Sequence, residues 1–409
     1  MPSDFKKLMT ARFFFTLGVQ MQAIVLAWRM YELTKDALFL GLIGLMEAIP
    51  ALSLALFAGY IVDRSRPLVI YRRLVLVSLT SASIMLLSQL ETFGVSEKDQ
   101  IVLLFCSSFL TGCARAFSQP SMYSIVPKII PRALLPRSSA WMSSAMQTAR
   151  VSGPALGGIL FGLIGVSGTS TIVFALLLVT LSVLFLMEFN APANNPERGK
   201  SVKEDLLSGA RFVFNHPILF PALSLDMVSV LFGGVTALLP IYAAEVLFIG
   251  PEGLGVLRAA PAIGAFIMST ILIKRDIKKN AGVKLFSGVA GFGACILVFA
   301  LSKNYQLTLV ALILSGAFDS ISMVIRTSAV QLVSPEHMRG RISAVNSIFI
   351  GSSNELGEFE SGVATKILGL IPAAVFGGVM CLSTVGLVAM TSPRLRRLDL
   401  EELEKTAQS

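Results

Sequence analysis

Long apolar runs alternate with short polar segments along almost the whole chain. From Phe13 to Met390 these runs are each roughly 20 residues long, which is enough to cross a bilayer core about 30 Å thick. The pattern predicts an all-α membrane protein of twelve spanning helices. The expected ranges are 10–33, 38–62, 68–90, 101–127, 137–164, 168–188, 217–247, 253–273, 283–302, 305–333, 341–368 and 371–391.

The composition agrees with this pattern. The chain has 409 residues, of which 54% are hydrophobic and 14% are charged, whereas a soluble domain carries about 25% charged residues. The composition therefore excludes two or three soluble domains, which the length alone would favour.

The net charge of +9 follows from topology. Of the 34 Lys and Arg residues, 25 lie in alternate connections, with Arg12 counted in the first of these. Six lie inside apolar runs, and the other connections hold only Lys35, Lys98 and Lys303. The positive-inside rule places the basic side in the cytoplasm. Both termini are then cytoplasmic, and a nucleic-acid partner is not needed to explain the charge.

The soluble segment from Phe189 to His216 divides the chain. It begins with a Pro- and Asn-rich linker and continues as an amphipathic helix over Ser201–Asn215, which we expect on the inner membrane surface. The predicted parts are a six-helix bundle over 1–188, this linker over 189–216, a second bundle over 217–392 and a cytoplasmic tail over 393–409.

The two predicted bundles share a weak repeat. A shift of 204 residues aligns the fourth and fifth predicted helices, and the connection between them, with the tenth and eleventh. Two parallel six-helix repeats around a central cavity are typical of transporters. Among the matched pairs are Gly112 with Gly316, Pro131 with Pro335, Arg137 with Arg341, Gly153 with Gly357, and Gly158 with Gly362.

Two short motifs stand at helix ends and crossings. Gly59, Asp63, Arg64 and Arg66 mark the connection after the second helix, which without further information is a plain positive-inside loop. In the fifth helix, glycines allow close packing and a proline kinks or stiffens the helix. These residues are Gly153, Pro154, Gly157 and Gly158.

Both motifs resemble those of the major facilitator superfamily. The resemblance implies that the loop is a cytoplasmic gating latch, although Arg72-Arg73 comes later than the usual basic pair, and that the helix motif is of the antiporter type. With Trp28–Thr34, Leu40–Ala51, Arg339–Arg341 and Asn354–Gly362, the chain resembles the branch that includes the enterobactin exporter and macrolide-efflux proteins. That branch exports siderophores or drugs by proton antiport, and its relatives often act as monomers.

The eleventh predicted helix holds three acids near its middle. Charged groups at this depth usually face a cavity or a partner. Glu355 and Glu358 share one face, whereas Glu360 points about 160° away from Glu358. We expect Glu358, with Glu355, to face the cavity, and Glu360 to pair with Lys366 or Arg326. The alternative is that all three acids only join helices through salt bridges.

Further polar groups lie within the spans. We predict a cavity lined by Asp319, Asp226, Glu47, Arg115 and Arg150, with cations from the N-terminal half and anions from the C-terminal half. Gln20 and Gln22 either bind the substrate or join neighbouring helices.

Several absences narrow the chemistry. The sequence has no Walker-type nucleotide loop, and its histidines, His216 and His337, fall in cytoplasmic connections. We therefore expect no cofactor, no metal site, and a proton gradient that acts through carboxylates.

The sequence thus predicts an inner-membrane exporter of an amphipathic siderophore or drug, which works by proton antiport and alternating access. An importer or a lipid or lysolipid flippase on the same fold is the alternative. A membrane enzyme would need a nucleophile–base pair or metal site, and none can be named.

Overall fold

The computed structural model describes residues 2–89, 94–131, 134–188, 202–274, 279–335 and 338–403. In these ranges the chain is helical, with no β-strand. Some helical positions are described by their backbone alone, and these are 56, 59, 60, 63, 135–137, 139, 140, 202–207, 273, 274, 339, 340, 343, 344, 347 and 355.

The contacts within the chain define two compact units. The first contains Met1–Arg198 together with Leu239–Ala259, and the second contains Gly199–Leu238 together with Ala260–Ser409. Leu239–Ala259, which belongs to the predicted second bundle, packs into the first unit. The predicted bundle boundaries at 188 and 217 stay a prediction.

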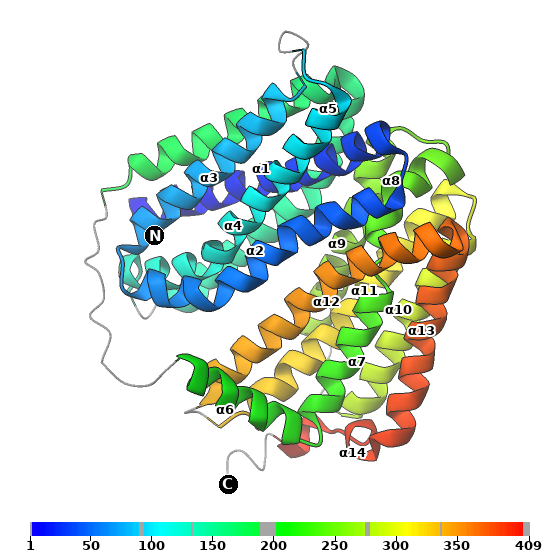
Figure 1. Cartoon of the computed structure of the whole chain (residues 1–409). Coiled ribbons are helices and arrows are strands. Elements are labelled where there is room, and N and C mark those ends of the chain that lie inside the picture. Colours follow the sequence, from blue (N-terminus) through cyan, green and yellow to red (C-terminus); the bar gives the residue numbers. More distant parts are fainter. Residues whose placement is uncertain are drawn as a thin grey trace. The chain divides into compact units, whose positions relative to one another are not determined.

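The first unit is built from five long helices. α1 packs along α5, while α2 and α3 pack on α4 (Figure 1). Short pieces from later in the chain, α8, η4 and the first turns of α9, complete this unit. The bounds are α1 Ser3–Thr34, α2 Ala37–Asp63, α3 Pro67–Leu87, α4 Glu97–Ile129, α5 Leu135–Phe185, α8 Leu239–Ile241, η4 Tyr242–Val246 and α9 Pro251–Lys274.

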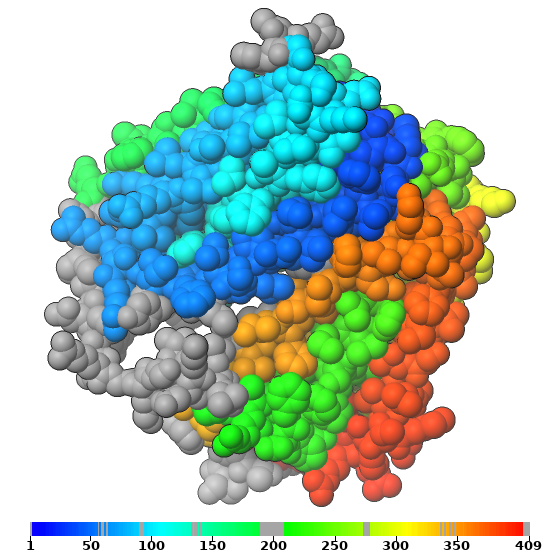
Figure 2. All heavy atoms as spheres, in the orientation of Figure 1, coloured from blue at the N-terminus to red at the C-terminus, as the bar shows by residue number. Residues whose placement is uncertain are grey.

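The second unit has a matching set of helix pairs. α12 packs on α7, and α10 packs on α11 and α13. On the face shown in Figure 2, α7 (green) lies beside α12 (orange) and α13 (red). The bounds are α6 Val202–Asn215, α7 Leu219–Phe232, η3 Val235–Leu238, α10 Ala281–Leu301, α11 Tyr305–Val333, α12 Arg339–Leu368, α13 Leu370–Thr391 and α14 Pro393–Arg396.

The spans agree with the predicted twelve. Ten helical segments of the described chain are long and apolar enough to cross a membrane. One of them, Trp141–Phe185, holds two predicted spans that meet at a kink at Gly165, where φ is 70°. α12 is not among the ten, because its charged and polar residues lower its hydropathy. The predicted all-α membrane fold is confirmed.

The prediction of one continuous helix over 217–247 is wrong. α7 ends at Phe232, and the chain continues through Gly233 and Gly234 into a 3₁₀ turn, a short α-turn and a π-turn. Adjacent glycines weaken a helix, and Pro240 supplies no backbone N–H. After the break the backbone pairs locally, with the Val235 N–H donating to the Gly233 carbonyl at 2.8 Å.

The repeated glycines make equivalent helix crossings in the two units. Gly112 of α4 lies against the backbone of Glu47 in α2, and Gly316 of α11 lies against the backbone of Pro261 in α9. Likewise Gly153 brings α5 onto α1, and Gly357 brings α12 onto α7. The sequence repeat therefore marks the positions where helix backbones come closest.

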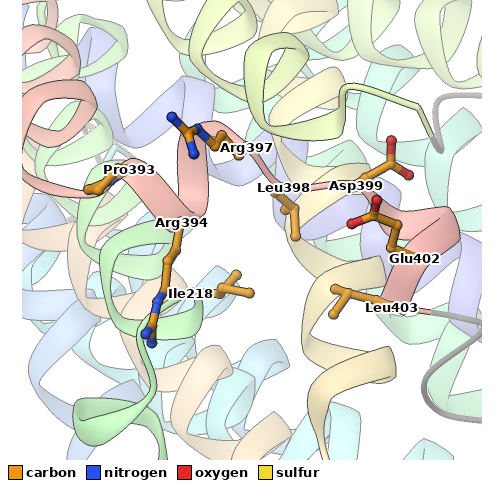
Figure 3. Close-up of a pocket in the computed structure, with 8 residues that line it drawn as sticks. All are labelled: Ile218, Pro393, Arg394, Arg397, Leu398, Asp399, Glu402 and Leu403. Carbon is orange, nitrogen blue, oxygen red and sulfur yellow. The ribbon is translucent and has the colours of Figure 1, made fainter.

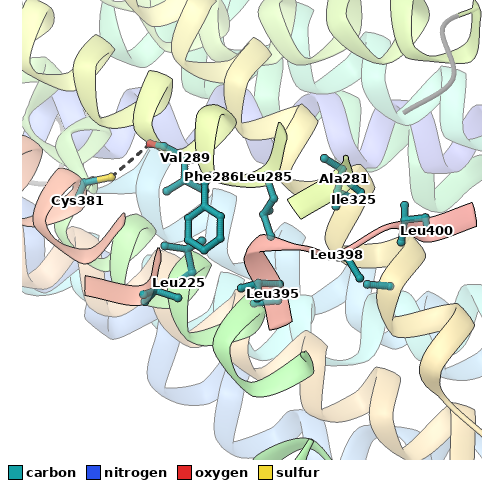
Figure 4. Packing of buried hydrophobic residues seen from close by; sticks show 13 residues of the cluster. Leu225, Ala281, Leu285, Phe286, Val289, Ile325, Cys381, Leu395, Leu398 and Leu400 are labelled. Carbon is teal, nitrogen blue, oxygen red and sulfur yellow. Dashed lines mark hydrogen bonds between the residues drawn. The ribbon is translucent and has the colours of Figure 1, made fainter. Parts of the chain in front are cut away.

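The residues after α13 fold back onto α10. The Gly282 N–H donates to the Leu398 carbonyl at 2.9 Å. Leu395, Leu398 and Leu400 enter a buried apolar cluster with α7, α10, α11 and α13, where the Cys381 thiol donates to the Val289 carbonyl at 3.7 Å (Figure 4). This part of the predicted tail is thus a packed element of the second unit.

Candidate functional site

A polar cavity lies beside the break after α7, within the second unit. It has a volume of about 170 Å³. Two carboxylates and one amide face it among apolar side chains and glycines. Its lining comprises Val230, Gly233, Gly234, Val235, Thr236, Pro261, Phe292, Ile296, Leu312, Ser315, Gly316, Asp319, Asn354 and Glu358.

Glycine contacts place the polar groups around this cavity. A Cβ atom at Gly234 would lie 2.5 Å from the Gly357 carbonyl oxygen, and a Cβ atom at Gly357 would lie 2.7 Å from the Leu231 oxygen. This backbone contact sets Glu358 and Asn354 beside the break. Gly316 of α11 lies against the backbone of Pro261 in α9, and Asp319, three residues later on α11, lines the cavity.

A second acid of this unit is already neutralised by a partner. Asp226 of α7 pairs with Arg326 of α11, and their side chains are only 8% and 3% exposed. Burial without such a pair would leave an isolated charge at high cost. Asp319 borders both the cavity and a small void between α7, α10 and α11 that Asp226 and Ser322 also line.

This pairing changes one expectation from the sequence. Arg326 was one of the two partners expected for Glu360, and it pairs with Asp226 instead. Glu358 and Asp319 both line the cavity, whereas the side chain of Glu355 lies outside the described set. Their coupling role stays a prediction.

Sequence reasoning missed the break that shapes this cavity. Gly233, Gly234 and Thr236 all line it, as does Asn354, whose side-chain amide donates to the Ile350 carbonyl at 2.8 Å. The adjacent glycines within an apolar span were the available signal, because interrupted helices often build transporter sites.

In the first unit the predicted polar residues take different positions. Arg115 and Glu47 form an ion pair at 2.5 Å. Arg150 is exposed, and Gln20 packs against Gly153. Gln22 is 1% exposed and donates to Ser81 at 2.7 Å, so it joins α1 to α3. Of the two alternatives for Gln22, this geometry supports helix joining.

The fifth-helix motif is a packing surface. Gly153 and Gly157 contact α1, while Gly158 lies against Pro251 and Gly255 at the start of α9. A Cβ atom at Gly255 would lie 2.5 Å from the carbonyl oxygen of Pro154. Any added side chain on this surface would push one of the helices away.

The loop motif lies between α2 and α3. Arg64 and Arg66 are exposed, and the Ser65 N–H donates to the Val62 carbonyl at 3.2 Å. The structure describes Gly59 and Asp63 by their backbone alone, so the latch assignment stays a prediction.

Another polar contact in the first unit joins α1 to η4. The Tyr31 hydroxyl donates to Glu245 at 2.8 Å, and Lys35 lies over the Tyr31 ring. Glu245 belongs to the π-turn of the broken seventh span, so the irregular backbone there carries a specific polar contact.

A shallow cavity of about 470 Å³ lies outside the spans, beside the segment after α13 (Figure 3). Both charge signs line it, with Arg394 and Arg397 beside Asp399 and Glu402. Desolvation acts to raise the pKa of Asp399, but hydrogen bonds from backbone N–H groups, including those of Glu401 and Asn280, outweigh it and lower that pKa. These bonds anchor the segment.

Among the residues that the structure describes, His, Cys, Asp and Glu side chains form no group of three suited to a metal ion.

Comparison with known proteins identifies the family of this fold. A family model described as transmembrane secretion effector, of the MFS type, matches residues 2–408. The chain is similar to the uncharacterized MFS-type transporter YjbB of Bacillus subtilis, with 25% identity over 94% of this chain and 92% of the relative. It is also similar to the multidrug efflux pump Tap of Mycolicibacterium fortuitum, with 24% identity over 92% of each chain.

A solved structure agrees on the fold. A POT family transporter in complex with 5-aminolevulinic acid superposes with a TM-score of 0.78 at 12% identity, over 97% of each chain. Because the family model spans nearly the whole sequence, this multi-pass membrane protein belongs to the transmembrane secretion effector family of MFS-type transporters, whose fold is that of transporters and not of enzymes.

Proposed function

We propose that this chain is a secondary transporter that exports amphipathic small molecules across the inner membrane in exchange for protons. The cavity at the α7 break carries this proposal, because Asp319 and Glu358 both line it. Two intramembrane acids on separate helices beside an interrupted span are typical of a coupling site. The termini are cytoplasmic in this proposal, and the transporter acts as a monomer without a cofactor.

Each acid has a defined role in the proposed cycle. A carboxyl group in an apolar cavity gains or loses its proton as the surrounding charges and water change. Glu358 and Asp319 take up protons from the outside and release them to the cytoplasm. Substrate binding competes with these protons or displaces them, so substrate and protons are not bound at the same time.

The proton gradient supplies enough free energy for export. One unit of pH difference is worth about 1.4 kcal/mol per proton, and a potential of 100 mV adds about 2.3 kcal/mol per charge. When both act together, one proton per cycle supplies about 3.7 kcal/mol and sustains a gradient of roughly five-hundredfold for a neutral substrate.

The relatives support efflux and favour drugs over siderophores as cargo. Tap carries the name of a multidrug efflux pump and aligns over most of both chains. The apolar lining from Phe292, Ile296 and Leu312 suits the apolar part of such a molecule.

The test is proton flux in sealed proteoliposomes that contain the full chain and a pH dye. A pH gradient is imposed, and lipophilic drugs, macrolides and siderophores are added in turn. We expect one compound class to drive proton movement, and Glu358→Gln and Asp319→Asn to reduce that flux at least tenfold.

The matched control is Glu97→Gln, which removes an exposed carboxylate in the first turn of α4 and should keep the wild-type flux. Coupled flux that survives in both cavity variants would refute the assignment of these acids. Substrate uptake with the proton gradient would show an importer, and lipid movement without protons would show a flippase.

A further inference from the structure

Arg12 is a buried cation that the proposed coupling site does not use. Arg12 is only 5% exposed, and its Nη1 group donates a hydrogen bond to the Ser118 hydroxyl of α4. Its Nε atom is buried without a hydrogen-bond partner. A guanidinium has five N–H donors, and burial of an unmatched donor is unfavourable. The first unit therefore contains a buried, permanently charged guanidinium group with an N–H that donates no hydrogen bond.

Two further guanidinium groups come close to Arg12. Arg115 lies one turn before Ser118 on the same face of α4, because residues three apart are neighbours on a helix. Arg150 of α5 lies within electrostatic range of both Arg12 and Arg115. α1 packs along α5 just beyond this level, where Gly153 meets Gln20, so three helices contribute one cation each.

Among the described residues, one member of this group, Arg115, has an acid as its ion-pair partner. Glu47 of α2 pairs with Arg115 at 2.5 Å. No hydrogen bond or ion pair of Arg150 occurs in the part of the chain that the structure describes, and its side chain is exposed. Like charges in a low-dielectric environment repel one another, and a bound anion would relieve that repulsion.

We propose that Arg12, Arg115 and Arg150 form a subsite for a carboxylate or phosphate group. Guanidinium groups bind such anions through paired N–H donors and remain charged at any physiological pH. Arg150 provides the accessible contact, and Arg12 supplies charge from behind it. The inference rests on the proposed transport function and specifies its cargo: amphipathic molecules that carry an anionic group.

The anionic group has two possible sources, a transported molecule or a lipid headgroup. Rhodamine 110 and its methyl ester, rhodamine 123, separate them, because the two dyes differ in one carboxyl group. Binding is measured by fluorescence polarisation to the full chain in phosphatidylcholine nanodiscs, without a proton gradient. We expect the free acid to bind at least tenfold more tightly than the ester.

The variants Arg150→Gln and Arg12→Gln should each weaken binding of the free acid about tenfold or more and leave the ester unchanged. Lys98→Gln, which removes an exposed cation at the start of α4, should change neither dye. Arg12→Lys keeps the charge, and thermal unfolding of each variant identifies a loss of folding.

The lipid arm repeats the measurement with phosphatidylglycerol in the discs. Two results together would assign the subsite to a lipid headgroup. The free acid would bind more weakly in these discs, and phosphatidylglycerol would be retained by the wild type but lost from Arg150→Gln. Equal binding of both dyes together with unselective lipid retention overturns the subsite. Because no gradient is applied, failure of proton coupling in the flux assay leaves this result unaffected.

Discussion

His216 caps the start of α7 through its imidazole ring. Its Nδ1 atom accepts hydrogen bonds from the backbone N–H groups of Ile218 at 3.2 Å and Leu219 at 3.3 Å. The nitrogen accepts only when it carries no proton. Burial lowers the pKa of His216, so folding favours the neutral ring.

This cap makes stability depend on pH. Above about 6.5, the unfolded pKa of histidine, the ring is neutral in both states and the cap contributes fully. As the pH falls below that value, the unfolded state takes up a proton first and the contribution is lost. His216→Asn retains a cap acceptor that does not titrate. Between pH 8 and pH 5 we expect its free energy of unfolding to fall by about 1 kcal/mol less than that of the wild type.

Thermal unfolding in detergent across that pH range measures the difference. Equal slopes for the two proteins would show that another group controls the acid sensitivity. His216→Ala, which removes the cap, should be less stable than both at pH 8.

Single residues were predicted unevenly from the sequence. Asp319 and Glu358 could be identified from the sequence, because each is a charged residue inside a long apolar run. The pairing of Asp226 with Arg326 was not predictable, because these residues lie 100 positions apart in the sequence and meet only when α7 packs near α11. Arg12 was assigned to the cytoplasmic cations, because its position near the N-terminus does not reveal that it is buried.

Helix crossings at the repeated glycines leave no room for a side chain. At Gly316 and at its repeat equivalent Gly112, an added Cβ would collide with backbone atoms of the neighbouring helix. We expect Gly316→Ala and Gly112→Ala each to lower stability by about 1–3 kcal/mol, the usual range for overpacking. Gly386→Ala in α13 is the control, since its Cβ would meet nothing within 4 Å.

Thermal unfolding of the three variants decides this point. A Gly386→Ala protein as unstable as the other two would mean that the close helix crossing does not determine the effect. Alanine favours helix more than glycine, so the control should be at least as stable as the wild type.

Elements were predictable where apolar runs are bounded by polar residues, and unpredictable inside a run. Hydropathy identified the seventh span but not its break, because periodicity in a uniformly apolar segment does not register a loss of helical geometry. The predicted connection between the helices 137–164 and 168–188 coincides with the kink at Gly165 inside α5, because the short segment there separates two full-length apolar runs.

The whole molecule was predictable in outline because a bilayer permits few solutions. A lipid-exposed backbone must satisfy its own hydrogen bonds, which leaves helices as the answer for long apolar runs. The assignment of chain segments to compact units was not predictable, since it depends on contacts between helices and not on hydropathy.

The charge distribution predicts the topology of the whole chain. In a variant without the four native cysteines, Lys98→Cys and Lys303→Cys should react with a membrane-impermeant maleimide in intact cells. Lys284→Cys should react only after the membrane is opened. Labelling in the reverse pattern would contradict the cytoplasmic placement of the termini.

The membership of Leu239–Ala259 in the first unit has a consequence for biosynthesis. A ribosome that has completed residue 198 has not yet made the segment that contributes Glu245 to Tyr31 and Gly255 to Gly158. The first unit therefore reaches its full set of contacts only after α7 has been synthesised. The helices insert in the order of the chain, but the first unit is complete only after Leu239–Ala259 has been translated.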